Sequence, residues 1–183
     1  MDNLEQLKQA SDPATSVEDL MTLAGHAIEV DRALARHPSA TAELLESIMY
    51  AEDEDGNFDR EVRTSVVQHP NVSTATFCEL SAQYPKDAIK NPSMDALLKA
   101  NSELLVSCSA LLELEGCPEG WLKRGASSSW YPVKLQTLRN PKLTEKFVLD
   151  CQQMCFLKKL KPFCRNLRKN KKMDLQSIFW RNI

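Results

Sequence analysis

Cysteine is the residue type with the clearest chemical potential in this sequence. Four thiols lie in the C-terminal part of the chain, at Cys117, Cys151, Cys155 and Cys164. Four thiolates can bind zinc or an iron–sulfur cluster. Their spacing, however, lacks the C-x-x-C pair of most such sites, and a buried free thiol behaves as a small apolar residue. We therefore expect structural cysteines with no metal or cofactor, and keep a metal or iron–sulfur accessory protein as the weakest of three functional hypotheses.

Histidine stands directly before proline at His37 and His69, where other parts of the chain place Asn91 and Asn140. Both residue types donate and accept hydrogen bonds, but an amide cannot act as a base. The exchange therefore predicts hydrogen bonding at chain corners and not acid–base catalysis. The sequence also lacks G-x-S-x-G, a phosphate-binding glycine loop and H-E-x-x-H, so we do not expect an enzyme.

An acidic stretch from Glu52 to Asp59 includes the letters D-E-D-G-N and resembles part of a calcium-binding loop. Aligning Gly56 with the sixth loop position puts Ala51 first and Val62 twelfth, where carboxylates are required. We therefore favour a solvated acidic loop over a calcium site.

Charge divides sharply along the chain. Residues 1–120 contain 8 Lys/Arg and 22 Asp/Glu, whereas residues 121–183 contain 15 Lys/Arg and 3 Asp/Glu. The basic half peaks between Leu157 and Lys172, where no acidic residue occurs. Its cations are the candidate binding residues: Lys158, Lys159, Lys161, Arg165, Arg168, Lys169, Lys171 and Lys172.

Four interpretations of this basic segment stay open. Its apolar residues recur every three or four positions, as in an amphipathic helix that Pro162 breaks or kinks. It is expected to cap the preceding repeats, or to bind an acidic protein surface, including the acidic half of this chain. A cationic stripe also suits a nucleic-acid backbone. An anionic membrane surface is the fourth interpretation.

The elements that position these groups repeat along the chain around X-Pro corners. The corners are Asp12-Pro13, His37-Pro38, His69-Pro70, Asn91-Pro92 and Asn140-Pro141, with Cys117-Pro118 as a weaker copy. An oxygen-bearing residue stands three positions after the proline, at Ser16, Thr41, Ser73, Asp95 and Thr144. Apolar residues follow at seven and ten positions, in the pairs Leu20/Leu23, Leu45/Ile48, Phe77/Leu80 and Val148/Cys151.

The pattern predicts a short helix, a proline corner and then a capped helix in each unit. The oxygen caps the N–H groups left unpaired at a helix start, and the apolar residues share one helix face. One unit is too small to bury that face, so neighbouring units must stack.

This pattern resembles the variant leucine-rich repeat family over about residues 12–151. The resemblance implies a right-handed solenoid of alternating α and 3₁₀ helices in a mostly bacterial family. One member carries an iron–sulfur cluster in a cysteine-rich segment before its repeats. Here the first cysteine is Cys78, so that cluster is not carried over.

The bulk properties indicate an ordinary folded chain. Its hydrophobic content of 43% and charged content of 26% are usual for a soluble domain. No apolar run approaches the length of a membrane span, and the acidic start lacks a signal-peptide core. We therefore expect a cytoplasmic protein. Residues 1–11 are expected to be a lead-in or first helix, and Gly125 to Ser129 a flexible connection.

Together these observations predict an all-α protein. Residues 1–151 are expected to form the helical-repeat solenoid and residues 152–183 a basic helical cap or tail. The first functional hypothesis is a non-catalytic adaptor whose protein partner has an acidic patch. The second is a nucleic-acid-associated accessory protein that uses the basic segment.

Overall fold

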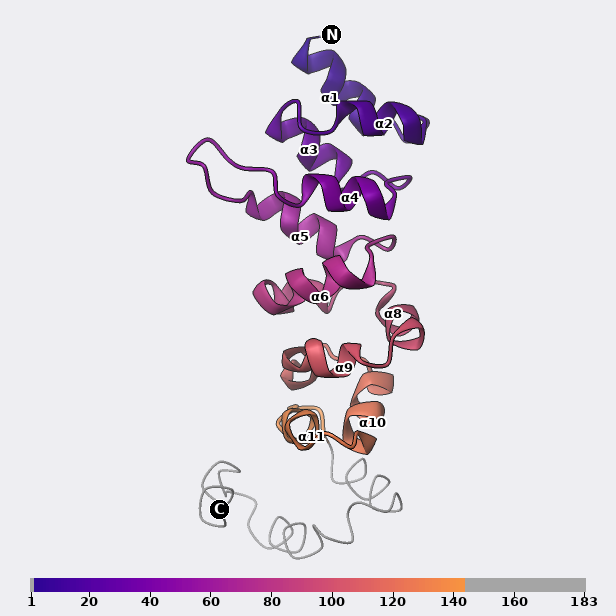
Figure 1. Ribbon diagram of the computed structural model, residues 1–183, viewed down its shortest axis with the longest axis vertical. Coiled ribbons are helices and arrows are strands. Elements are labelled where there is room, and N and C mark those ends of the chain that lie inside the picture. Colours follow the sequence, from indigo (N-terminus) through magenta and orange to yellow (C-terminus); the bar gives the residue numbers. More distant parts are fainter. Residues whose placement is uncertain (1, 144–183) are drawn as a thin grey trace, which may run out of the picture. The chain divides into compact units, whose positions relative to one another are not determined.

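The computed structural model describes residues 2–143, and within them it confirms the all-α prediction (Figure 1). Apart from one isolated bridge between Glu52 and Phe58, these residues are helices and connecting turns. None of the described helices is long and apolar enough to span a membrane. The chain divides into two compact units, residues 1–111 and 112–183, and each is described by itself.

The first unit consists of short α-helices. Before its corners lie α1 (Asn3–Ser11), α3 (Ile28–Leu34), α5 (Arg60–Gln68) and α7 (Pro85–Ala88). After its corners lie α2 (Val17–Leu23), α4 (Ala42–Ile48), α6 (Thr74–Gln83) and α8 (Met94–Ala100), followed by α9 (Leu104–Ser107). The 3₁₀ helix η1 (Ser109–Glu113) spans the boundary between the units.

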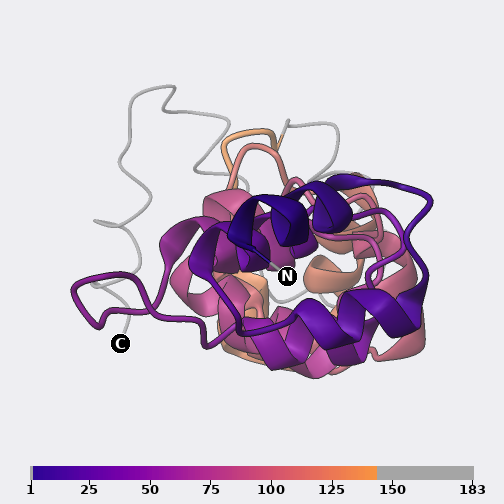
Figure 2. The ribbon, with the colours of Figure 1, turned by 90° about the horizontal axis from the view of Figure 1, so that it is seen from above.

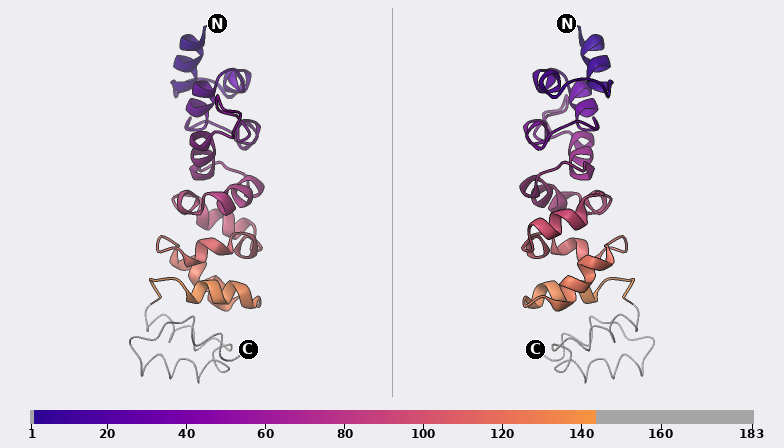
Figure 3. Two further views of the ribbon diagram at one scale, coloured as in Figure 1. Left: turned by 90° about the vertical axis from the view of Figure 1, so that its left-hand side faces the viewer. Right: turned by 90° about the vertical axis from the view of Figure 1, so that its right-hand side faces the viewer.

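Within residues 2–111, the helices before the corners stack on one another. Helix α1 packs on α3, α3 on α5 and α5 on α7. Helices α2 and α4 lie on the other side of α1 and α3, so this part of the chain has two layers (Figures 2 and 3). The stacking predicted from the repeat pattern is therefore present in this unit.

Three of the predicted helix caps are formed. In each, the side-chain oxygen three positions after the proline accepts a backbone N–H from the first helical turn, at 3.1–3.3 Å. The pairs are Ser16 with Asp19, Thr41 with Leu44, and Ser73 with Thr76. The prediction for Asp95 is wrong, because α8 begins at Met94 and its N-cap is Ser93, two residues before Asp95, without a side-chain cap bond.

The apolar repeat positions form the core of this unit. Leu20, Leu45 and Phe77 are fully buried, as are the valines of α5 that precede the third corner. Burying one such side chain contributes about 1.5–3 kcal/mol. The helices before the corners are α-helices and not the 3₁₀ helices implied by the resemblance. Only their last turns tighten, as in the bond from His37 N–H to the Leu34 carbonyl at 3.1 Å.

The side chains of His37, His69 and Asn91 each bond both within their own corner and to the preceding repeat. The side chain accepts the N–H two residues further on, and it donates to a carbonyl of the preceding repeat. His37 Nε2 lies 2.8 Å from the Asp12 carbonyl oxygen, and His69 Nε2 lies 3.0 Å from that of His37. Asn91 Nδ2 donates to the His69 carbonyl at 2.9 Å. Four corners, from Asp12 to Asn91, are thus linked in a ladder.

The partners of the two histidines fix their protonation. The Nδ1 atoms of His37 and His69 accept the N–H groups of Ser39 and Asn71, each at 3.1 Å. A carbonyl oxygen only accepts, so the proton of each ring is on Nε2 and both rings are neutral. The prediction that these residues are corner hydrogen-bonders is confirmed.

The second unit contains α10 (Glu119–Ser127) and α11 (Tyr131–Leu138), which pack on each other. The expectation of a flexible connection from Gly125 is wrong, since α10 continues to Ser127. Gly125 is instead a point of close approach, where an added Cβ would overlap Thr137 Oγ1 of α11. Asn140 repeats the corner arrangement here and donates to the Leu112 carbonyl at 2.8 Å.

Candidate protein-binding surface

The acidic loop between α4 and α5 is a compact hairpin that projects from the stack of the first unit (Figure 1). Its two arms are joined by bonds from Asp59 N–H to the Ala51 carbonyl at 2.8 Å and from Asp53 N–H to the Asn57 carbonyl at 2.7 Å. Gly56 has a φ of +76°, a conformation that favours glycine, and it closes the turn. These backbone bonds give the acidic hairpin, residues 52–59, a defined shape.

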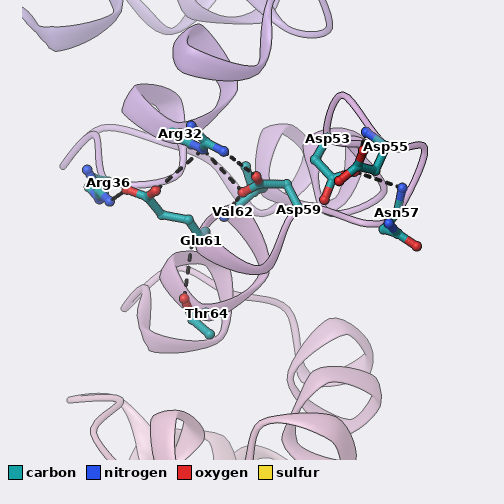
Figure 4. A network of polar contacts seen from close by, with 9 residues as sticks. All are labelled: Arg32, Arg36, Asp53, Asp55, Asn57, Asp59, Glu61, Val62 and Thr64. Atoms are coloured by element: carbon teal, nitrogen blue, oxygen red, sulfur yellow. Dashed lines mark hydrogen bonds and ion pairs between the residues drawn. The ribbon is translucent and has the colours of Figure 1, made fainter.

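One carboxylate oxygen of Asp53 stabilises this turn. Its Oδ1 accepts the N–H groups of Asp55 at 3.0 Å and Asn57 at 2.9 Å (Figure 4). Across residues 2–143, no three or more His, Cys, Asp or Glu side chains gather where they could hold a metal ion. The hairpin therefore presents the exposed, negatively charged side chains of Glu52, Glu54 and Asp55. Its internal hydrogen bonds hold the backbone that carries them.

Two aromatic rings stand at the base of the hairpin. Tyr50 and Phe58 are 50% and 48% exposed, and their ring centroids are 6.0 Å apart in an edge-to-face arrangement. Buried Arg63 of α5 lies beneath them, with its guanidinium carbon 4.1 Å from the Phe58 centroid. Rings of this kind, half exposed and fixed in place, are typical anchors of protein interfaces.

Arg63 also fixes the hairpin base to the stack. Its Nε donates to the Met49 carbonyl at 3.0 Å, and Nη1 donates to Gln83 Oε1 of α6 at 2.7 Å. The Tyr50 hydroxyl donates to Glu79 Oε2 at 3.2 Å. The aromatic pair is therefore held by α5 and α6 and does not depend on the hairpin alone.

An ion-pair network joins α3 to the start of α5 on the neighbouring surface (Figure 4). Arg32 Nη2 lies 2.6 Å from Asp59 Oδ2, and Arg32 Nε lies 3.4 Å from Glu61 Oε2. Arg36, in the turn after α3, also pairs with Glu61. Because Asp59 ends the hairpin and begins α5, the network ties the hairpin to α3.

Asp59 is held in its charged form. Burial alone raises the pKa of its carboxyl, but the hydrogen bonds from Arg32 and from the Val62 N–H outweigh burial and lower the pKa below its ordinary value. The Val62 bond, 2.8 Å from N to Oδ1, is the N-cap of α5. One carboxylate therefore caps a helix and pairs with a neighbouring repeat.

Next to this network lies a groove of about 410 Å³. It is lined by Leu7 and Ser11 of α1, Glu29 of α3, Arg36 in the turn after α3 and Glu61 of α5, among others. The walls carry charges of both signs, and within this groove the described side chains present no nucleophile paired with a base.

The residues singled out from the sequence fall into two groups. The basic segment, from Lys158 to Lys172, lies outside the described residues, as do Cys151, Cys155 and Cys164. Cys117 is buried in the second unit, and its Sγ lies 3.8 Å from the Pro118 carbonyl oxygen. Four-cysteine metal binding and the partner of the basic segment therefore stay predictions.

Sequence reasoning missed the aromatic base and the ion pairs. Tyr50 precedes the acidic run and Phe58 stands near its end, and that placement was a readable signal for a hairpin with an aromatic base. Arg32 and Asp59 are 27 residues apart, and no local pattern marks them as partners.

Residues 5–57 match the model of the Leucine Rich Repeat Variant domain. The match begins in α1 and ends within the acidic hairpin, so it covers the first two corners of the ladder. Comparison with the curated proteins and with the solved structures gave no match.

Proposed function

Because residues 5–57 match the model of the Leucine Rich Repeat Variant domain, we propose that this protein is a non-catalytic helical-repeat adaptor that binds another protein. Stacked repeats suit this role because neighbouring units make one continuous surface. The observation that carries the proposal is the acidic hairpin with its half-exposed Tyr50 and Phe58, which are fixed by Arg63. The bacterial cytoplasm is the proposed setting.

The hairpin is complementary to a basic partner surface. Glu52, Glu54 and Asp55 are charges that attract Lys and Arg over several ångströms. Phe58 and Tyr50 add apolar contact area and ring faces for cations. We propose that the first contact pairs this surface with a basic strip on the partner.

The basic segment is the proposed second contact. Its eight cations, from Lys158 to Lys172, are complementary to an acidic patch on the same or a second partner. An adaptor with an acidic repeat part and a basic end therefore bridges surfaces of opposite charge.

Co-purification from the native cell, followed by binding measurements with the purified partner, tests the proposal. The wild-type chain is compared with Phe58→Ser and with a chain that lacks residues 157–183. Met21→Ser is the matched control, because Met21 is 42% exposed on α2 and is not part of the hairpin. We expect Phe58→Ser to weaken binding by about tenfold or more, as for an interface anchor, and Met21→Ser to leave it unchanged.

A partner whose affinity is the same for wild type, Phe58→Ser and the shortened chain would contradict the proposal. Loss of affinity only in the shortened chain would place the interface on the basic segment and remove the hairpin from it.

Nucleic-acid binding is the second candidate, favoured by eight cations and no acid between Leu157 and Lys172. Such binding weakens steeply with salt, because each phosphate contact releases counterions. Titrating a single-stranded and a double-stranded oligonucleotide at several salt concentrations tests this candidate. Binding that disappears with residues 157–183 supports it, and no binding at low salt removes it.

A further inference from the structure

Two cysteines that have no place in the proposed function lie against each other in the first unit. Cys78 is half-buried on α6, and Cys108 is buried at the C-terminal end of α9. Their sulfur atoms are 3.6 Å apart, and the Cys108 thiol donates to Cys78 Sγ. They are separated by 30 residues in the sequence, so the fold brings them together.

We propose that Cys78 and Cys108 are a thiol-oxidation site that reacts with a small soluble disulfide and becomes an intramolecular disulfide bond. The two sulfurs of a disulfide are about 2.0 Å apart. Rotation of the two side chains about their Cα–Cβ bonds supplies the remaining approach. The inference does not depend on the proposed function.

The difference in exposure sets the order of the reaction. Cys78 is the accessible thiol, so its thiolate attacks one sulfur of the soluble disulfide. A mixed disulfide on Cys78 forms, the soluble S–S bond breaks, and the leaving thiolate takes up a proton. Cys108 then loses its proton to solvent and attacks Cys78 Sγ. The second small thiolate leaves and is protonated, so two cysteines are oxidised while one soluble disulfide is reduced to two thiols.

The second step is expected to be the slow one. Burial, together with the neighbouring Cys78, raises the pKa of Cys108 to about 12. Only the thiolate attacks, so the rate of this step rises roughly tenfold per pH unit below that value. The Ser81 hydroxyl lies 3.2 Å from Cys108 Sγ and donates to it, a bond it shares with the Cys78 carbonyl at 3.1 Å. Ser81 therefore favours the Cys108 thiolate.

The new bond would tie α6 to the end of α9. In the sequence, α7 and α8 lie between these two points, and α8 has no side-chain hydrogen bond at its N-cap. Linking two points this far apart in sequence restricts the unfolded chain, so the oxidised protein should melt roughly 5–10 °C higher than the reduced protein.

The test exposes the folded full-length protein to oxidised glutathione, blocks the remaining thiols by alkylation in acid, and maps the peptides without reduction. The expected product is a peptide around Cys78 joined to one around Cys108, with a protein mass lower by two hydrogens. Mapping separates this product from any linkage made by Cys151, Cys155 or Cys164.

Single variants separate the two steps. Cys108→Ser should stop at a glutathione adduct on Cys78, whereas Cys78→Ser should leave Cys108 unmodified because it is buried. Ser81→Ala should slow the second step at a given pH without changing the first, and Ser81→Thr, which keeps the hydroxyl, should restore it. A wild-type protein that retains the adduct on Cys78 overturns the proposal. The proposal is also overturned if alkylation finds both Cys78 and Cys108 still as free thiols after other exposed thiols have reacted with oxidised glutathione.

Discussion

At the scale of single residues, the corners explain why histidine and asparagine exchange along this chain. Each supplies an acceptor for the N–H two positions on and a donor for a carbonyl of the previous repeat. The side chain must therefore be bifunctional, short and neutral. A charged imidazolium has no acceptor and does not fit the corner.

Replacing His69 with Asn tests this equivalence. We expect His69→Asn to lower the free energy of unfolding by less than about 1 kcal/mol, because the amide can make both bonds. His69→Leu should cost about 2–4 kcal/mol, since it leaves the Asn71 N–H without its acceptor and removes one of the two donors to the His37 carbonyl, which keeps only the Ala40 N–H. Urea unfolding at neutral pH measures both values, and equal costs for the two variants would contradict the corner role.

The same residue makes stability depend on pH. Burial lowers the pKa of His69, although its bond to the His37 carbonyl opposes the shift. A group with a lowered folded pKa contributes its full stability above the unfolded value, about 6.5 for histidine, and loses it as pH falls through the folded value. Wild type should therefore lose more stability than His69→Asn between about pH 7.5 and pH 5. If the free energy of unfolding of the two proteins changed by the same amount between those pH values, His69 would not be the source of the pH dependence.

Asp59 provides a second test at a residue with two roles. Asp59→Ala removes the N-cap of α5 and the ion pair with Arg32, and we expect a loss of about 2–4 kcal/mol. Asp59→Asn keeps a capping oxygen for the Val62 N–H and should lose about half as much. Since the folded pKa of Asp59 is lowered, its contribution is complete above about pH 4 and disappears as pH falls further. Thermal unfolding of both variants from neutral pH to acid checks the order and the pH range.

At the scale of helices, the parts predicted from sequence are those with local causes. The caps at Ser16, Thr41 and Ser73 follow from one oxygen at a fixed distance from a proline, and the buried Leu20, Leu45 and Phe77 follow from helical spacing. The hairpin base and the Arg32–Asp59 pair depend on contacts between repeats, which no local spacing encodes.

Gly125 shows how composition misled the interpretation of an element. Next to three serines it suggested a flexible connection, but it lies inside α10. Glycine suits this position because α11 approaches too closely for a side chain. The position of α11 is a tertiary fact that the sequence letters around Gly125 do not contain.

Substituting Gly125 with Ala therefore has two opposing effects. Alanine favours a helix by about 1 kcal/mol, but its Cβ would overlap Thr137 Oγ1, and overpacking costs about 1–3 kcal/mol. We expect Gly125→Ala to be destabilising in wild type and neutral or stabilising in a Thr137→Ala background. A double-mutant cycle measured by denaturant unfolding gives the coupling directly. Additive effects would show that the two helices are not in close contact.

At the scale of the whole molecule, acidic and basic residues are separated along the chain. The acidic residues are concentrated in the part that contains the corner ladder, and the basic residues follow it. Within residues 2–111, each repeat buries its apolar face on its neighbours, so a defect in one repeat should weaken the next.

Truncating a core residue checks this dependence. Leu45→Ala removes a fully buried side chain from α4 and should cost about 3–4 kcal/mol. Met21→Ala, on the exposed side of α2, should cost less than about 0.5 kcal/mol. Native-state hydrogen exchange of Leu45→Ala should show lost protection in α2 and α6 as well as in α4. A loss confined to α4 would mean that the repeats are independent.

The most direct test of the corner ladder is nitrogen NMR of the histidine rings in the full-length protein. At neutral pH, the ladder predicts that His37 and His69 are each a single neutral tautomer with the proton on Nε2, and that Nδ1 accepts a hydrogen bond. His26 is exposed and serves as the internal comparison. Rings of His37 and His69 that exchange between the two neutral tautomers, or that carry the proton on Nδ1, would show that the corners do not join one repeat to the next.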